Sequence, residues 1–102
     1  MPDQFYIVEG VRRAVAAREL GLPTLPATLE RPGHPDHDFD VPLDRLHAGR
    51  DSTPRMEPRF LRVYYGLQDP AQRPSLPRII LVPLANASGG YTVPLQSVRL
   101  TP

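Results

Sequence analysis

The stretch FYIVEGVRRAVAARELG, residues Phe5–Gly21, decides how the first third of the chain folds. The run Gln4–Val8 is rich in aromatic and β-branched residues, which favours a short strand. Gly10 supplies a tight turn, and VRRAVAAREL, residues 11–20, consists of strong helix formers. Gly21 stands where a C-cap glycine belongs. The stretch therefore predicts a strand, a tight turn and a capped helix.

Two adjacent arginines, Arg12 and Arg13, lie in the first turn of this predicted helix. A helix start exposes unpaired N–H groups and carries a partial positive charge, so cations there are unfavourable unless an anion or an acidic partner is present. A phosphate at this position would meet the backbone of Gly10 and Val11, the N–H groups and up to two guanidinium groups. The pattern thus makes this helix start a candidate phosphate site.

The acids Glu9 and Glu19 offer the other explanation, in which they pair with the arginines at the surface. Arg12 and Glu19 are seven residues apart and share a helix face, whereas Arg13 points about a quarter turn away. Glu19 can therefore neutralise at most one of the two arginines. Glu9 is also the candidate for acid–base chemistry beside a bound phosphate.

The composition restricts the classes of function. At 102 residues the chain is one small domain with a single core, and the absence of cysteine excludes disulfides, thiolate chemistry and cysteine-based zinc sites. All twelve basic residues are arginine, a bias typical of GC-rich genomes, and each guanidinium is a planar fork suited to phosphate or carboxylate. No apolar run approaches the roughly 20 residues that span a bilayer, and no leader peptide is visible, so we expect a soluble protein.

The middle of the chain predicts short elements separated by loops. The segment 22–30 reads as an extended strand whose prolines favour a strand start or a sheet edge. Residues 31–38 read as a loop, and DFDVPLDRL, residues 38–46, as a strand that runs into a turn or short helix. Residues 47–54 read as a further loop, and RMEPRFLRVYYGL, residues 55–67, as an amphipathic helix.

The last quarter contains the most apolar run, RIILVPL at residues 78–84, which predicts a central strand. A turn at Gly89-Gly90 precedes YTVPL and SVRL, which predict one or two closing strands. The expected fold is a small α/β or α+β domain with a mixed sheet and about two main helices.

The segment YIVEGVRRAVAARELGLPTLPATL, residues 6–29, resembles the phosphate-binding box of the ParB/sulfiredoxin-like superfamily. In that box a strand ends in a Gly-x-x-Arg turn, a helix of the form RxxAAxxLG follows, and an xxIPAxx strand comes next. The matching residues here are Tyr6, Val8, Gly10, Arg12, Arg13, Ala16, Ala17, Leu20, Gly21, Pro26 and Ala27.

The half that usually precedes the box lies downstream in this chain. DVPLDRLHAGRDSTPR at residues 40–55 is similar to the usual opening, RFLRVYYGL to its helix, and LPRIILVPL to the strand before the box. The order is swapped, which we interpret as a circular permutation typical of ParB-like domains in bacterial polymorphic toxins. Residues 1–30 would be the box, 31–38 a linker joining the former termini, and 39–102 the former N-terminal half.

The resemblance implies a protein that binds or hydrolyses nucleotides, binds DNA or acts as a nuclease, and it does not select among these activities. It implies Arg50 or Arg55 as a third phosphate ligand. It fixes no cofactor, and a nucleoside triphosphate with a divalent cation is the candidate. A toxin-type domain would act in the cytoplasm, after delivery from another cell, and would meet an immunity protein. Sulfiredoxin activity is excluded because Val11 stands in the region of the catalytic cysteine and the chain has none. ParB partition proteins, which clamp chromosomal DNA, also have a Glu-Asn-x-x-Arg segment and a helical domain that reads DNA. This sequence shows neither, so a role as a chromosome-partition clamp is disfavoured.

Three weaker patterns remain. The loop residues His34, Asp36, His37, Asp38 and Asp40 are metal-ligand types, but a proline-punctuated loop is a poor cage and we expect no metal site there. The predicted helix carries Arg55, Arg59 and Arg62 along its length, which fits either a nucleic-acid backbone contact or an ordinary charged face. Tyr64 and Tyr65 are interpreted as one core residue and one residue at the rim of the core. A nucleic-acid base could stack on Tyr65 if that side chain faces the cleft.

The alternative function is a non-catalytic interaction module. In that case the arginines meet an acidic partner, such as an immunity protein, and the fold is a retained scaffold.

Overall fold

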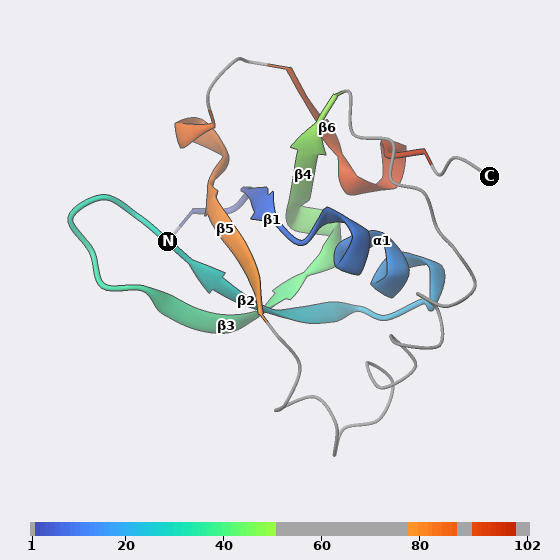
Figure 1. The fold of residues 1–102 in the computed structure, drawn as a ribbon, viewed down its shortest axis with the longest axis horizontal. Coiled ribbons are helices and arrows are strands. Elements are labelled where there is room, and N and C mark those ends of the chain that lie inside the picture. Colours follow the sequence, from blue (N-terminus) through green and yellow to red (C-terminus); the bar gives the residue numbers. More distant parts are fainter. Residues whose placement is uncertain (1, 51–77, 88–90, 100–102) are drawn as a thin grey trace.

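A six-stranded mixed sheet forms the centre of the molecule (Figure 1). The structure is a computed structural model that describes residues 2–50, 78–87 and 91–99. The strands are β1 (Phe5–Glu9), β2 (Thr24–Leu29), β3 (His37–Pro42), β4 (Leu46–Gly49), β5 (Ile79–Pro83) and β6 (Thr92–Pro94). The described residues contain one α-helix, α1 (Val11–Glu19), and three 3₁₀ turns, η1 (Leu43–Arg45), η4 (Leu84–Asn86) and η5 (Leu95–Ser97). The fold is therefore α+β, as expected, and the predicted helix at 55–67 lies outside the described residues.

The strand order β3-β2-β5-β1-β4-β6 places β5 inside the sheet, between β2 and β1. It runs parallel to β2 and antiparallel to β1. β1 is parallel to β4, whereas β3 and β6 close the two edges in antiparallel pairs. The prediction that RIILVPL forms a central strand is confirmed.

The core lies between one face of the sheet and α1. Because strand side chains alternate between faces, β1, β2, β4 and β5 each place alternate residues in this core, and β3 adds Val41. The buried strand residues are Phe5, Ile7, Leu25, Ala27, Leu29, Val41, Leu46, Ala48, Ile79 and Leu81. Residues 14–17 of α1 are all fully buried, so the helix is enclosed on more than one side.

The C-terminus of α1 confirms the predicted glycine cap. Gly21 adopts a positive φ of 74°, and its N–H donates to the carbonyl of Arg18 at 3.0 Å. The N–H of Leu22 donates to the carbonyl of Ala17 at 3.0 Å. These two bonds form a Schellman motif, which satisfies carbonyl groups that the helix leaves unpaired.

Two predicted loops are partly strand, and those predictions were wrong. β3 begins at His37, inside the predicted loop 31–38, and β4 occupies most of the predicted loop 47–54 that the structure describes. Leu46 and Ala48 are fully buried in β4, which pairs with β1 on one side and β6 on the other. Pairing with strands distant in sequence therefore overrides the polar local composition.

Pro26 also departs from expectation, because it lies inside β2 rather than at a strand start or a sheet edge. β3 pairs with β2 along its whole length, but β5 joins β2 only from Ala27 onward. At Pro26 the strand is thus paired on one side, which leaves room for a residue without an N–H.

The closing region forms β6 and then the turn η5, so the second closing strand is not formed among residues 97–99.

Candidate functional site

β1 ends in an irregularity that turns Glu9 away from the core. Ile7 lies opposite Leu81, but Glu9 lies opposite Ile80, so β1 carries one residue more than β5 at this point. Regular alternation would place Glu9 on the buried face with Ile7. The bulge moves it to the other face, where it is exposed.

Gly10 makes the tight turn from β1 into α1, as predicted. Its φ of 109° and ψ of 24° are left-handed, a conformation that favours glycine. A Cβ at Gly10 would also lie 2.5 Å from Cγ2 of Ile79. The Gly10 carbonyl accepts the N–H of Ala14 at 3.0 Å, which is the first bond of the helix. This glycine therefore brings the helix start directly against the end of β5.

The first turn of α1 holds Arg12 and Arg13. Its N-cap residue, Gly10, offers no side-chain hydrogen bond, and no acidic residue lies in the turn. Arg12 is exposed and Arg13 half-buried, and each makes at least one interaction within the protein. Two cationic residues thus lie in the turn where the helix dipole is positive.

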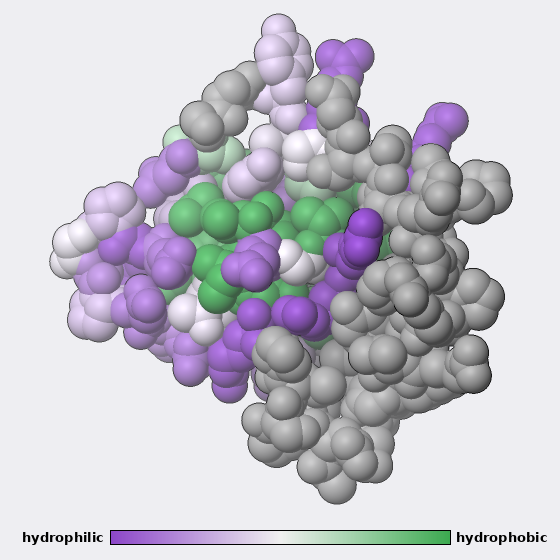
Figure 2. Space-filling view, viewed as in Figure 1, coloured by the Kyte–Doolittle hydropathy of each residue, from purple (hydrophilic) through white to green (hydrophobic). Residues whose placement is uncertain are grey.

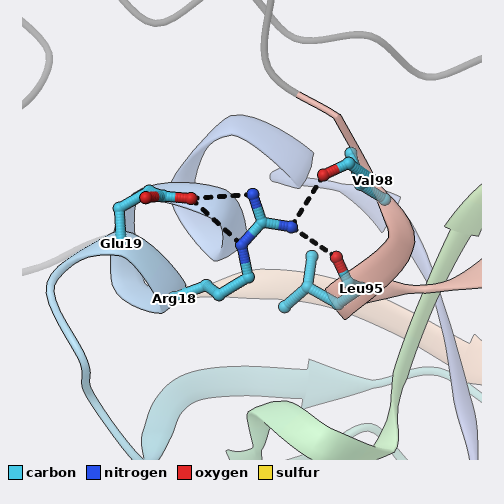
Figure 3. A network of polar contacts seen from close by, with 4 residues as sticks. All are labelled: Arg18, Glu19, Leu95 and Val98. Carbon is cyan, nitrogen blue, oxygen red and sulfur yellow. Dashed lines mark hydrogen bonds and ion pairs between the residues drawn. The ribbon is translucent and has the colours of Figure 1, made fainter.

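Glu19, which the sequence offered as a partner for Arg12, forms an ion pair with Arg18 (Figure 3). Nε and Nη2 of Arg18 donate to Oε1 of Glu19 at 3.2 and 2.8 Å. Nη1 of Arg18 donates to the carbonyls of Leu95 and Val98 at 2.6 and 2.8 Å. Arg18 therefore ties the last turn of α1 to the turn η5.

The sequence analysis did not single out Arg18, although a signal was present. Arg18 lies seven residues after Val11 and four after Ala14, so it shares a helix stripe with residues that contact the core.

Replacing Arg18 with alanine is expected to lower the free energy of unfolding by about 2 kcal/mol, because two carbonyls lose a charged donor. Urea unfolding followed by circular dichroism measures this. Arg18→Lys should recover only part of the loss, since an ammonium group lacks the planar fork. Glu19→Gln is the control and should cost about 0.5 kcal/mol or less, because the pair is at the surface. Equal losses for Arg18→Ala and Glu19→Gln would show that the carbonyl contacts contribute little.

Arg50, a predicted third phosphate ligand, follows β4, the parallel neighbour of β1. Its backbone N–H donates to the carbonyl of Tyr91 at 2.9 Å, and its guanidinium lies 5.9 Å from the Tyr91 ring centroid. The described contacts of Arg50 are thus to Tyr91, and its role toward a phosphate stays a prediction. The other arginines and tyrosines proposed from the sequence lie outside the described residues: Arg55, Arg59, Arg62, Tyr64 and Tyr65.

No protein family, curated protein or solved structure matches the chain. Its function is therefore inferred from the geometry of its own residues.

Within the described ranges, no helix is both long and apolar enough to cross a membrane.

Arg78, just before β5, is a second arginine that the sequence analysis missed. Its Nη1 donates to the carbonyls of Ala27 and Phe39 at 3.1 and 3.4 Å, and its Nε lies 3.5 Å from the Asp38 carboxylate. The hydroxyl of Thr28 also donates to Asp38, at 2.6 Å. Asp38, one of the metal-ligand types noted in the sequence, therefore takes part in a polar network that joins β2, β3 and the start of β5.

The other members of that histidine and aspartate set do not assemble around a common point. The His37 ring stacks on Phe39 with centroids 5.5 Å apart, and His34 and Asp36 are exposed. Across residues 2–50, 78–87 and 91–99, no group of three or more acidic or histidine side chains is arranged to hold a metal ion.

His47 lies on the face of the sheet that carries Tyr6. Its Nε2 is 2.8 Å from Oε1 of Gln4, and Tyr6 is its neighbour across the strand pair. Partial burial lowers the pKa of His47, because the charged imidazolium loses hydration. The neutral form is thus favoured in the folded protein.

Proposed function

We propose that this chain binds a phosphate-bearing ligand, a nucleotide or a nucleic acid, at the start of α1, in a ParB/sulfiredoxin-like domain of permuted order. One observation carries the proposal. The left-handed turn at Gly10 leads into a first helical turn with no acid and no side-chain cap, and that turn contains Arg12 and Arg13. Arg12 and Arg13 make contacts within the protein, and the helix start together with their positive charge would attract an anion to this turn.

The energetics show which groups such a ligand needs. A helix start contributes at most about 2 kcal/mol to an anion, whereas millimolar to micromolar binding requires about 4 to 8 kcal/mol. Hydrogen bonds to charged groups contribute about 1.5 to 3 kcal/mol each. The two arginines would therefore supply most of the affinity. Gly10 and Val11 would let the ligand come close to the backbone N–H groups.

Glu9 is the proposed proton acceptor if the bound ligand is hydrolysed, as in a toxin-type nuclease or a nucleotide-using enzyme. The bulge at the end of β1 keeps Glu9 exposed and one residue from the turn at Gly10. A carboxylate in that place can accept a proton from an attacking water. A divalent cation would arrive with the nucleotide phosphates rather than in a protein cage.

Thermal-shift measurements with nucleoside triphosphates and magnesium test the binding. A ligand at ten times its Kd stabilises the folded state by about 1.4 kcal/mol, and for a domain of this size that raises Tm by about 5 °C or more. Arg12→Ala/Arg13→Ala should weaken binding about tenfold to a hundredfold and remove the shift.

Arg45→Ala/Arg99→Ala is the matched control, because it removes two exposed arginines elsewhere in the chain. It should keep the shift. A lack of any shift with every nucleotide, together with nucleic-acid binding that is unchanged in Arg12→Ala/Arg13→Ala, would reject the proposal. The arginines would then serve an interaction module that meets an acidic partner.

A further inference from the structure

The face of the sheet opposite α1 carries a partly exposed apolar patch. Tyr6 lies opposite Val82, Ile80 follows on the same face of β5, and Val8 lies at the bulge with 54% of its surface exposed. Figure 2 shows hydrophobic side chains gathered over the middle of the sheet, with hydrophilic ones to the left of them and below them. We call Tyr6, Val8, Ile80 and Val82 the open face. Val8 is exposed and the other three are partly buried, and grouped apolar side chains that reach the surface are typical of interaction surfaces.

Carboxylates lie on the same side of the sheet as the open face. Glu9 lies there because the bulge places it opposite Ile80. Asp38 belongs to the same side because it lies opposite Thr28, which itself lies opposite Ile80. Asp40 is two residues further along β3. All three carboxylates are exposed, and Arg78 offsets Asp38 only through a 3.5 Å ion pair.

The charges decide which occupant suits this surface. A nucleic acid laid across this face would bring phosphates toward Asp38 and Asp40, and like charges repel. A second copy of the chain, placed face to face, would oppose the same carboxylates. An apolar segment with lysine or arginine at its borders buries the patch and meets the acids with opposite charge.

We propose that the open face docks a protein segment that is apolar on one side and basic at its borders. This surface lies opposite the face that α1 covers, and the inference does not rest on phosphate binding by α1. The protein would thus present a positive helix start to one ligand and a negative, apolar sheet face to another.

Two synthetic peptides test the docking. One is a helical peptide of about 14 residues with leucine on one side and lysine at its borders, and the other carries glutamate in place of each lysine. Amide chemical shifts of the ¹⁵N-labelled full chain map the contact, and fluorescence anisotropy gives the affinity. The lysine peptide should shift the amides of the open face and bind at least about tenfold more tightly than the glutamate peptide.

Variants separate specific docking from general attraction to an acidic protein. Val8→Ser removes exposed apolar surface without adding charge, and should weaken the lysine peptide about threefold to tenfold. Asp40→Lys should weaken the lysine peptide and strengthen the glutamate peptide. Arg12→Ala/Arg13→Ala should bind the lysine peptide as the native chain does.

Three results would overturn the proposal. One is equal binding of the two peptides, and another is shift changes confined to α1. The third is a patch occupied instead by single-stranded DNA or by a second copy in sedimentation experiments. Failure of nucleotide binding would leave this inference standing. The two surfaces share Glu9, but the docking variants Val8→Ser and Asp40→Lys lie outside the first turn of α1.

Discussion

Gly10→Ala is expected to destabilise the protein by about 3 to 5 kcal/mol, one of the two largest effects among the substitutions considered. Two costs add at this position. Alanine is strained at the φ of 109°, and its methyl group would lie 2.5 Å from Cγ2 and 2.9 Å from Cβ of Ile79. Ile79 is fully buried in the central strand and cannot move without disturbing the core.

Gly21→Ala provides a matched control for this prediction. Gly21 also has a positive φ, of 74°, but a Cβ there would meet no atom within 4 Å. Only the backbone strain remains, so the expected loss is about 1 kcal/mol. Chemical unfolding in urea compares the two variants. Losses of similar size would mean that α1 starts further from β5 than the structure shows.

Leu81→Ala should cost about 2 to 5 kcal/mol, since it opens a cavity in the middle of the core. Leu81 is fully buried, and its strand β5 lies between β1 and β2. Its neighbours across the sheet, Ile7 and Leu29, are also almost fully buried and would lose contacts on both sides.

Val82→Ala is the control for Leu81→Ala, because Val82 points to the open face and is only partly buried. It should cost about 1 kcal/mol or less. Thermal and urea unfolding measure both variants. If Val82→Ala were the more damaging of the two, β5 would be shifted in register by one residue, which exchanges the two faces.

The local features of the site were predictable because their signals lie within a few residues. Glycines mark both ends of α1, and strong helix formers lie between them, so the turn at Gly10 and the cap at Gly21 follow from short-range chemistry. The apolar run before Leu84 similarly identified the central strand.

The features that the sequence did not reveal depend on distant partners. β4 has only four residues, and its strand character comes from pairing with β1 and β6. Arg18 contacts carbonyls 77 and 80 residues away. The bulge at the end of β1 is defined only relative to β5, so the exposed direction of Glu9 had no local signal.

The insertion of β5 between β1 and β2 has a consequence for how the chain folds during synthesis. β1 and β2 emerge from the ribosome first, yet their shared neighbour begins at Ile79, in the last quarter of the chain. The early strands must therefore each keep an unpaired edge until β5 has been synthesised. Because contacts of long sequence separation slow folding, this topology favours slow completion of the sheet. The nascent chain is thus most prone to aggregation before β5 arrives.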